Sequence, residues 1–270
     1  MALTFRLERG RVERLDDSET LQVASSLLPQ GAYTSLRTYG ASGVLRLRQH
    51  VARLNETAAL VGTTDATVSE PAARELLRAA LGACAFPQSR VRLTWAPPAL
   101  YASLEPFLPL PEDFYRDGVR SVSVPVRREN PHAKDTRFIA TASAAYRSLP
   151  EGVHEGLLLA DDGAILEGLS SNFFAVKDGR LQTEELRALL GVTRSLVLEV
   201  ASGLLPIEPA AVLRSDLLAL SDAFITSVSR GILPVVEIDG QRIGSGQPGA
   251  ATQRLRRAFA ELESREVEPV

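Results

Sequence analysis

The sequence predicts an α/β protein with α+β character in two domains, and three observations support this. The chain has 270 residues, 45% of them hydrophobic, which is enough to build the cores of two domains. The first part alternates strand-like and helical segments, whereas short apolar runs ending in Gly or Asp turns dominate from residue 119 onward. The proline-rich segment 108–118 lies between the two textures. We therefore expect a smaller N-terminal α+β domain at 1–118 and a larger, strand-rich C-terminal domain with helices at 119–270.

Local patterns predict the elements of the first part in order. Residues 2–12 resemble short strands, and 31–47 resemble a hairpin with its turn at Gly40 to Gly43. A helix is predicted next, with one apolar face formed by Leu47, Val51, Leu54, Ala58 and Val61. A second helix has Ser69 as its N-cap and Pro71 in its first turn, and two strands then surround Pro97 and Pro98.

The second part is predicted to consist mainly of strands interrupted by helices. Each apolar run is short and rich in Val, Ile, Leu or Phe. Strands are expected within residues 121–126, 155–161, 163–168, 172–183 and 223–243. Helices are expected within residues 140–149, 193–204 and 250–264.

Composition and charge exclude several classes of function. The formal charge of −3 is spread along the chain, so we expect neither a nucleic-acid stripe nor a polybasic membrane patch. The single cysteine, Cys84, excludes an internal disulfide framework, and the three histidines are too far apart in sequence for metal-ligand spacing. The charged N-terminus and the lack of a long apolar run predict a soluble, cytoplasmic protein. Its expected partner is a small molecule, without a metal.

Lysine is scarce in this chain, which draws attention to Lys134. Only two of the 30 lysine and arginine residues are lysines, Lys134 and Lys177. Arginine stays protonated, whereas a desolvated lysine can become an amine nucleophile. Lys177 lies in a predicted hairpin turn, where a solvated lysine is ordinary, while Lys134 has weakly polar neighbours. Lys134 is therefore the candidate catalytic residue, and Lys177 is its natural control.

Further residues could complete a cofactor site. Glu167 lies between apolar runs, so it is either an edge-strand residue facing water or a buried counter-charge. Val192 and Thr193 follow Gly191 at a predicted helix start, where backbone N–H groups bind anions. Arg53 could pair bidentately with a phosphate. An amine, a carboxylate and anion donors are together what pyridoxal phosphate requires.

The order of these motifs resembles the class IV aminotransferases, the fold-type IV pyridoxal phosphate enzymes. This family includes branched-chain and D-amino-acid aminotransferases and aminodeoxychorismate lyase. The resemblance implies that Arg53, in "HVARL", binds the cofactor phosphate and that Lys134 forms the Schiff base. It also implies that Glu167, in "EGLSSN", meets the pyridine nitrogen and that Val192 and Thr193, in "GVTR", bind phosphate.

The chain departs from the family pattern at several positions. Val228 stands where the family often has a threonine, so Ser227 or Ser229 is expected to supply the phosphate hydroxyl. Ile139 stands where branched-chain enzymes place a tyrosine that bonds the ring hydroxyl, and Arg127 is the expected substitute.

The substrate is less well defined by the resemblance than the cofactor. Tyr33, Thr34 and Arg92 are candidate substrate contacts, but an Arg-Gly element that many members use near the substrate carboxylate is absent from "RLTWAPPALY". The resemblance implies a homodimer of two-domain chains that transfers an amino group between an amino acid and a 2-oxo acid. Aminodeoxychorismate lyase activity, which Thr34 favours, is the alternative. A non-catalytic protein that binds pyridoxal phosphate is a third hypothesis.

Overall fold

The structure is a computed structural model that describes residues 1–62 and 66–270, and it divides into two compact units. Unit 1 consists of Met1–Leu108, Ala133–Phe138 and Arg265–Val270. Unit 2 consists of Pro109–His132 and Ile139–Ser264. Each unit is assembled from segments that are separated in the sequence, so the units offer no single boundary to compare with the one expected after residue 118. That boundary remains a prediction.

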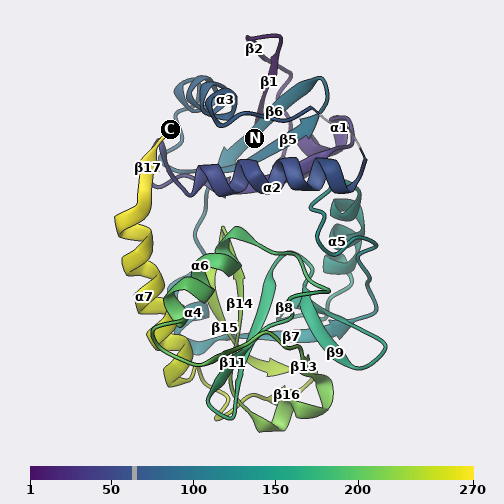
Figure 1. The fold of residues 1–270 in the computed structure, drawn as a ribbon, viewed down its shortest axis with the longest axis vertical. Helices are drawn as coiled ribbons and strands as arrows, with labels where there is room; N and C mark the ends of the chain where they lie inside the picture. The colour runs from purple at the N-terminus through teal and green to yellow at the C-terminus, as the bar shows by residue number, and fades with distance from the viewer. Residues whose placement is uncertain (63–65) are drawn as a thin grey trace. The chain divides into compact units, whose positions relative to one another are not determined.

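Unit 1 is built on an antiparallel sheet with the strand order β2-β1-β6-β5-β3. Its strands are β1 (Leu3–Glu8), β2 (Arg11–Arg14), β3 (Ala32–Arg37), β5 (Ser89–Ala96) and β6 (Ala99–Pro106). Its helices are α1 (Leu21–Leu27), α2 (Leu47–Leu60) and α3 (Glu70–Gly82), and α2 runs across the strands (Figure 1). A short pair of strands, β4 (Gly43–Leu45) and β17 (Val267–Pro269), completes the unit.

Helix α2 confirms four of the five positions of the apolar face that the sequence predicts. Leu47, Val51, Leu54 and Ala58 are buried in one cluster with residues of α3 and of the sheet, whereas Val61 is the half-buried C-cap. Burying each Leu or Val side chain contributes about 1.5 to 3 kcal/mol, so this face fixes the helix against the sheet. Ser69 caps α3, as predicted, because its hydroxyl accepts from the Ala72 N–H at 3.3 Å.

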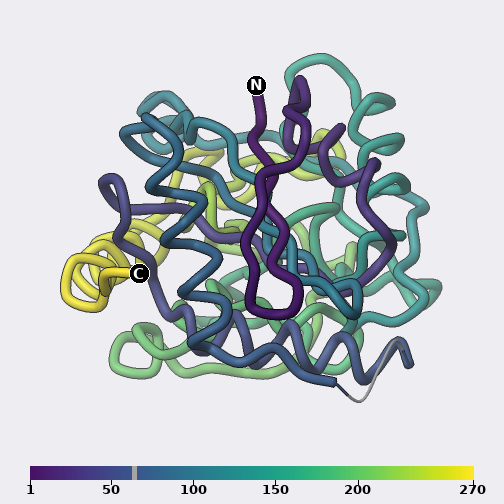
Figure 2. The backbone as a smooth tube through the Cα atoms, turned by 90° about the horizontal axis from the view of Figure 1, so that it is seen from above, coloured from purple at the N-terminus to yellow at the C-terminus, as the bar shows by residue number. Residues whose placement is uncertain are grey.

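The strand pairing of the hairpin predicted over residues 31–47 is wrong, although the predicted turn at Gly40 to Gly43 is present. β3 pairs with β5 along its whole length, whereas β4 pairs with β17. Residues Tyr39 and Gly43 form only an isolated bridge. The first true hairpin joins β1 to β2 through Arg9 and Gly10, both at positive φ, and Figure 2 shows it as the purple loop that starts at the N-terminus.

Unit 2 is built on a larger mixed sheet with the strand order β12-β11-β10-β14-β15-β7-β8-β9-β13. β9 also pairs with β10, which closes the strands between them into a ring, and β16 pairs with β15. The strands are β7 (Val119–Val124), β8 (Val153–Leu159), β9 (Ala164–Gly168), β10 (Asn172–Lys177), β11 (Arg180–Gln182), β12 (Ile207–Glu208), β13 (Val212–Leu213), β14 (Leu220–Ser227), β15 (Gly231–Ile238) and β16 (Gln241–Arg242).

The helices of unit 2 include the three that the sequence predicts in this part of the chain. They are α5 (Arg137–Arg147), α6 (Val192–Ala201) and α7 (Ala250–Glu266), of which α5 and α7 contribute residues to both units. α4 (Glu112–Asp117) and the 3₁₀ helix η1 (Arg214–Ala219) were not predicted, and α4 lies in the segment expected to be a linker.

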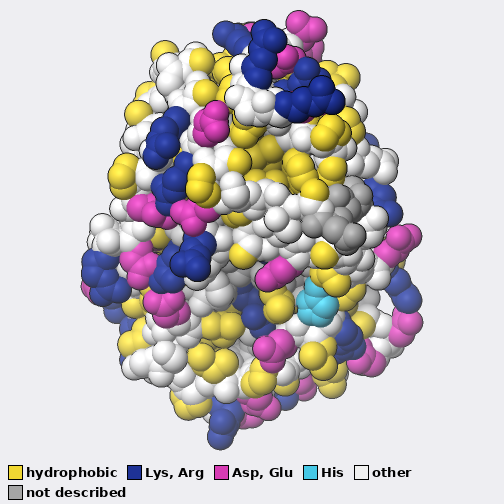
Figure 3. Space-filling view, turned by 45° about the horizontal axis from the view of Figure 1, so that its top comes forward, with side chains coloured by type: hydrophobic (Ala, Val, Ile, Leu, Met, Phe, Trp, Pro, Cys, Tyr) yellow, Lys and Arg dark blue, Asp and Glu magenta, His cyan; other side chains and the backbone are white. Residues whose placement is uncertain are grey.

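Charges of both signs are interspersed over the face drawn in Figure 3. Within residues 1–62 and 66–270, no helix has the length and apolarity needed to cross a membrane. The same described residues include no group of three or more His, Cys, Asp or Glu side chains placed to hold a metal ion.

Candidate active site

Lys134 belongs to unit 1, where hydrogen bonds hold its backbone. The Tyr33 N–H donates to the Lys134 carbonyl at 2.8 Å, and the Lys134 N–H donates to the Thr57 hydroxyl at 3.2 Å. Two residues on, the Thr136 N–H donates to the Gly31 carbonyl at 3.0 Å. The half-buried side chain places its Nζ 4.8 Å from the centre of the Tyr33 ring. The lysine is therefore held against β3 and α2.

Helix α2 presents a buried polar stripe toward the same region. His50, Arg53 and Thr57 follow one another at helical spacing, and all three are buried. Arg53 Nη2 donates to the Thr34 hydroxyl at 2.7 Å, and that hydroxyl lies 2.8 Å from His50 Nδ1. One face of α2 thus contacts the Lys134 backbone through Thr57 and carries the predicted phosphate arginine, Arg53.

Arg53 is a buried cation that has no carboxylate partner among the described residues. Its exposed fraction is 9%, and burial lowers its pKa to about 10. Within the part of the chain that the structure describes, Arg53 forms no ion pair, and its Nε has no hydrogen-bond partner. A buried charge without a partner costs several kcal/mol, so an anion supplied from outside the chain would be strongly stabilised here.

The predicted substrate residues also lie in unit 1. The Arg92 guanidinium carbon is 5.1 Å from the centre of the Tyr33 ring, the ring that Lys134 also contacts. Arg92 donates to the Ser25 hydroxyl, and burial lowers the Arg92 pKa. Thr34 has an exposed fraction of 0%, and its hydroxyl is engaged by two side chains. In this structure, therefore, Thr34 presents no surface to a substrate.

In unit 2, three polar residues lie opposite one another on neighbouring strands. Glu167 of β9 pairs in register with Asn172 of β10, which pairs with Thr226 of β14. Directly opposed residues share one side of a sheet, so the pairing that closes the ring also assembles these side chains. Glu167 is only 2% exposed, which excludes the edge-strand residue facing water.

The Glu167 carboxylate has two donors within unit 2. Arg128 Nε donates to Oε1 at 2.8 Å, and the Leu189 N–H donates to Oε2 at 3.1 Å. Both members of the Glu167–Arg128 ion pair have side chains less than a tenth exposed. A carboxylate offers about four acceptor sites, so Glu167 has capacity for a further cationic donor.

The N-terminus of α6 lies beside these residues. Gly191 is its N-cap without a side-chain hydrogen bond, and Val192 and Thr193 are buried in its first turn. A Cβ at Gly191 would stand 2.3 Å from Asn172 Oδ1, so a larger residue would require the Asn172 side chain to shift. The Thr226 hydroxyl is buried and has no hydrogen-bond partner among the described residues. Free helix N–H groups and an unused hydroxyl make this region suited to an anion.

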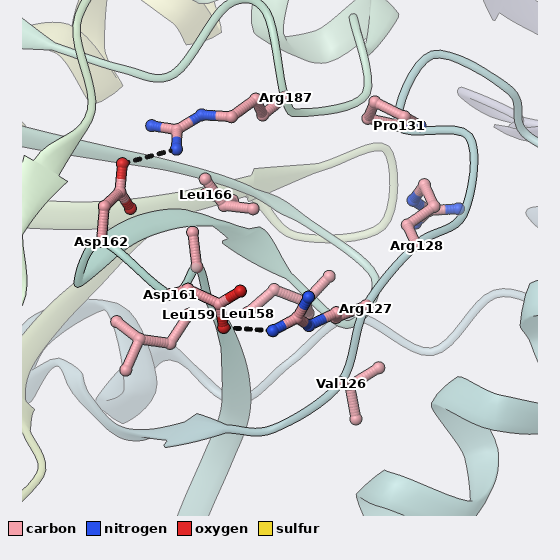
Figure 4. Close-up of a pocket in the computed structure, with 11 residues that line it drawn as sticks. Val126, Arg127, Arg128, Pro131, Leu158, Leu159, Asp161, Asp162, Leu166 and Arg187 are labelled. Carbon is pink, nitrogen blue, oxygen red and sulfur yellow. Dashed lines mark hydrogen bonds and ion pairs between the residues drawn. The ribbon is translucent and has the colours of Figure 1, made fainter.

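Two of the predicted cofactor residues are engaged elsewhere in unit 2. Arg127 is exposed and pairs with Asp161 at a pocket of about 440 Å³, where Figure 4 shows it pointing toward that carboxylate. Its neighbour Arg128 lines the same pocket and is the residue that reaches Glu167. Ser227 accepts from Arg230 Nε at 3.2 Å.

Sequence reasoning missed Arg128 and Thr226. Arg128 is next to Arg127, and Thr226 is next to Ser227, the two residues that the sequence analysis selected. The sequence alone does not show which of two neighbouring side chains faces the interior of the unit. The control lysine, Lys177, is the last residue of β10, next to the predicted hairpin turn, and its side chain forms an ion pair with Asp216 at 2.8 Å.

A buried ion pair that the sequence did not indicate supports the segment after Glu167. Glu155 is fully buried and accepts from Arg230 at 2.9 Å, Ser171 at 2.8 Å and the Tyr146 hydroxyl at 2.5 Å. Burial lowers the pKa of Arg230, but Glu155 and Tyr146 more than offset this, so the pKa is raised. Burial, aided by Glu155, also raises the pKa of Tyr146.

Comparison with known proteins identifies relatives of this chain. Residues 31–238 match the family described as amino-transferase class IV. A putative branched-chain-amino-acid aminotransferase of Methanocaldococcus jannaschii is 34% identical over 167 residues, 58% of each chain. The match thus spans little more than half the length of that relative. D-alanine aminotransferase of Bacillus licheniformis is 28% identical over 94% of this chain and 95% of its own.

Solved structures show the same fold. A putative branched-chain aminotransferase of Thermotoga maritima has a TM-score of 0.77 at 25% identity, covering 96% of this chain and 97% of its own. The branched-chain aminotransferase of Thermoproteus uzoniensis, solved with norvaline, has a TM-score of 0.79 at 24% identity, covering 99% of both chains. The predicted fold class and the predicted family resemblance are therefore both confirmed.

Proposed function

Since this chain belongs to the class IV aminotransferases, we propose that it is a pyridoxal phosphate enzyme that transfers an amino group between an amino acid and a 2-oxo acid. One observation carries the proposal. A single face of α2 contacts the backbone of Lys134, one of only two lysines, and carries Arg53, a buried guanidinium that forms no ion pair with any described carboxylate. A cofactor with an aldehyde and a phosphate requires a reactive amine and a cation that can bind the phosphate.

The residues present fit this cofactor in both units. In unit 1, Arg53 has an unpartnered Nε and no ion pair among the described residues, which suits a phosphate. In unit 2, the uncapped start of α6 and the unused Thr226 hydroxyl suit the same group. Glu167 is a buried carboxylate with spare acceptor sites, which suits a protonated ring nitrogen.

We propose the following roles for these residues. Arg53, the backbone N–H groups of Val192 and Thr193, and Ser227 or Thr226 would hold the phosphate. Glu167 would accept from the pyridine nitrogen, with Arg128 fixing the orientation of the carboxylate by its bond at 2.8 Å. When bound, pyridoxal phosphate withdraws electrons from the substrate Cα and makes its C–H bond acidic.

Lys134 would perform the proton transfer. Its Nζ is the group that would hold the cofactor aldehyde at rest and, once released by substrate, take the proton from the substrate Cα. The bonds to Thr57 and Tyr33 fix the backbone of Lys134, so that the remaining freedom is that of its side chain. Arg127, the predicted partner of the cofactor ring hydroxyl, pairs with Asp161, whereas Arg128 would act through the Glu167 carboxylate.

The test compares the two lysines. Lys134→Arg keeps the positive charge but removes the amine, so we expect loss of the bound-cofactor absorbance and of turnover, whereas Lys177→Arg should leave both unchanged. Purified enzyme is supplied with an amino-donor panel and 2-oxoglutarate. The proposal fails if Lys134→Arg retains turnover.

The same assay separates the other activities. Pyruvate and p-aminobenzoate formed from aminodeoxychorismate without an acceptor would show a lyase, and cofactor binding without turnover on the whole panel would show a binding protein. From the family resemblance we also propose that the protein is a cytoplasmic homodimer. Sedimentation equilibrium of the purified protein tests the oligomeric state.

A further inference from the structure

The Thr34 hydroxyl lies between two side chains of α2 within unit 1. It is 2.7 Å from Arg53 Nη2 and 2.8 Å from His50 Nδ1. All three residues are buried, and Thr34 is not exposed at all. The hydroxyl is therefore an internal link between strand β3 and helix α2.

Hydrogen-bond chemistry sets the direction of one of these bonds. A guanidinium only donates, so Thr34 accepts from Arg53. The Thr34 hydroxyl then either donates its proton to His50 Nδ1 or accepts a second bond from it, depending on the tautomer of the imidazole. Burial, together with the charges of Arg53 and Lys134, lowers the pKa of His50 well below its ordinary value, which favours the neutral imidazole.

The link limits the freedom of the Arg53 side chain. Arg53 forms no ion pair among the described residues, and its Nε has no partner, so few other contacts orient its guanidinium. The hydrogen bonds that join His50, Thr34 and Arg53 hold Nη2 of the Arg53 guanidinium and leave the rest of the guanidinium for a ligand. A preorganised donor loses less entropy on binding than a mobile one.

We infer that Thr34 and His50 are positioning residues that orient Arg53 toward the cofactor phosphate, and that Thr34 does not select the substrate. This inference rests on the proposed function, because the phosphate is that of pyridoxal phosphate. Loss of this orienting bond should weaken phosphate binding by roughly ten-fold, because Arg53 would then have to be ordered when the ligand binds.

The experiment uses Thr34→Val, which keeps the side-chain shape and removes the hydroxyl, with Thr34→Ser as the rescue. The matched control is Thr94→Val, because Thr94 is a buried threonine on the neighbouring strand whose hydroxyl has no partner. Each cofactor-free protein is titrated with pyridoxal phosphate and with pyridoxal, which lacks the phosphate.

We expect Thr34→Val to bind pyridoxal phosphate about ten-fold more weakly while its affinity for pyridoxal stays within about two-fold. Thr34→Ser should restore binding, and Thr94→Val should match the wild type. Equal loss for both ligands, no rescue by serine, or a changed ranking of amino donors in Thr34→Val would overturn the inference. A wild type that does not prefer pyridoxal phosphate over pyridoxal would instead overturn the proposed function.

A second pair of variants keeps the test decisive if Thr34→Val does not fold. His50→Phe removes the hydrogen-bond partner of the Thr34 hydroxyl, whereas His50→Asn offers in its place an amide that can accept or donate. Thermal unfolding of the cofactor-free proteins identifies those that are folded. We expect weaker phosphate-specific binding in His50→Phe than in His50→Asn, and equal binding in the two would contradict the inference.

Discussion

Replacing Glu155 with glutamine should destabilise the protein strongly, because it leaves the Arg230 charge buried without a counter-charge. The Glu155 side chain is 0% exposed and that of Arg230 only 16% exposed. Glutamine also places a donor amide against groups that now donate to Glu155, among them the Ser171 and Tyr146 hydroxyls. Removing one member of a buried ion pair costs about 3 to 5 kcal/mol.

This cost translates into a measurable shift of the melting temperature. For a chain of this length, 1 kcal/mol corresponds to about 2 °C, so we expect the Tm of Glu155→Gln to fall by roughly 6 to 10 °C. Differential scanning calorimetry measures the shift. Asp161→Asn is the control, because Asp161 and Arg127 form an ion pair whose side chains are 81% and 71% exposed. Its expected cost is below about 1 kcal/mol.

A double variant tests whether the charge is the cause. Glu155→Leu combined with Arg230→Met removes both charges, and such apolar replacements of buried pairs are often close to neutral. The double variant should therefore be more stable than either single variant. The reasoning is refuted if the two losses simply add, or if Glu155→Gln melts within about 2 °C of the wild type.

Three other changes test the site directly. Folding lowers the His50 pKa, so below about pH 6.5 the unfolded state binds a proton that the folded state does not. The unfolding free energy of the wild type, measured in urea titrations relative to His50→Asn, should therefore fall toward pH 5 by up to about 1.4 kcal/mol per pH unit. Parallel pH curves for the two proteins would contradict this. Thr226→Val should match or exceed the wild-type Tm without cofactor yet bind pyridoxal phosphate more weakly, because its hydroxyl is buried without a partner; unchanged affinity would remove Thr226 from the phosphate site. Gly191→Ala should lower cofactor affinity and stability, because the new Cβ would meet Asn172 Oδ1 at 2.3 Å, and a wild-type titration curve would show that the turn yields easily.

Local chemistry made much of the fold predictable. The face of α2, the Ser69 cap and the strands around Pro97 and Pro98 depend on residues close in sequence, and all three are confirmed. Strand pairing depends on distant residues instead. No local signal shows that β4 pairs with β17 at the other end of the chain, which is why the expected hairpin is wrong.

The proposed site differs from the predicted one by a single residue at two positions. Motif order selected Lys134, Glu167 and Arg53 as candidates, and their residue types are chemically distinctive. Arg128 and Thr226 were missed because successive side chains on an extended chain point to opposite sides, and a shift by one residue reverses the direction. The Glu155–Arg230 pair was invisible for another reason, since the two residues meet only through the closed ring of unit 2.

The assignment of residues 133–138 to unit 1 has a consequence for dividing this protein. The segment that carries Lys134 is encoded inside the sequence that builds unit 2, and its backbone bonds are to Tyr33, Thr57 and Gly31. A gene split after residue 118 would leave the lysine on one fragment and the strand and helix that hold it on the other. Neither fragment alone would contain both Lys134 and the residues that hold its backbone. A chimaera of this protein must therefore take both parts of the chain from the same parent.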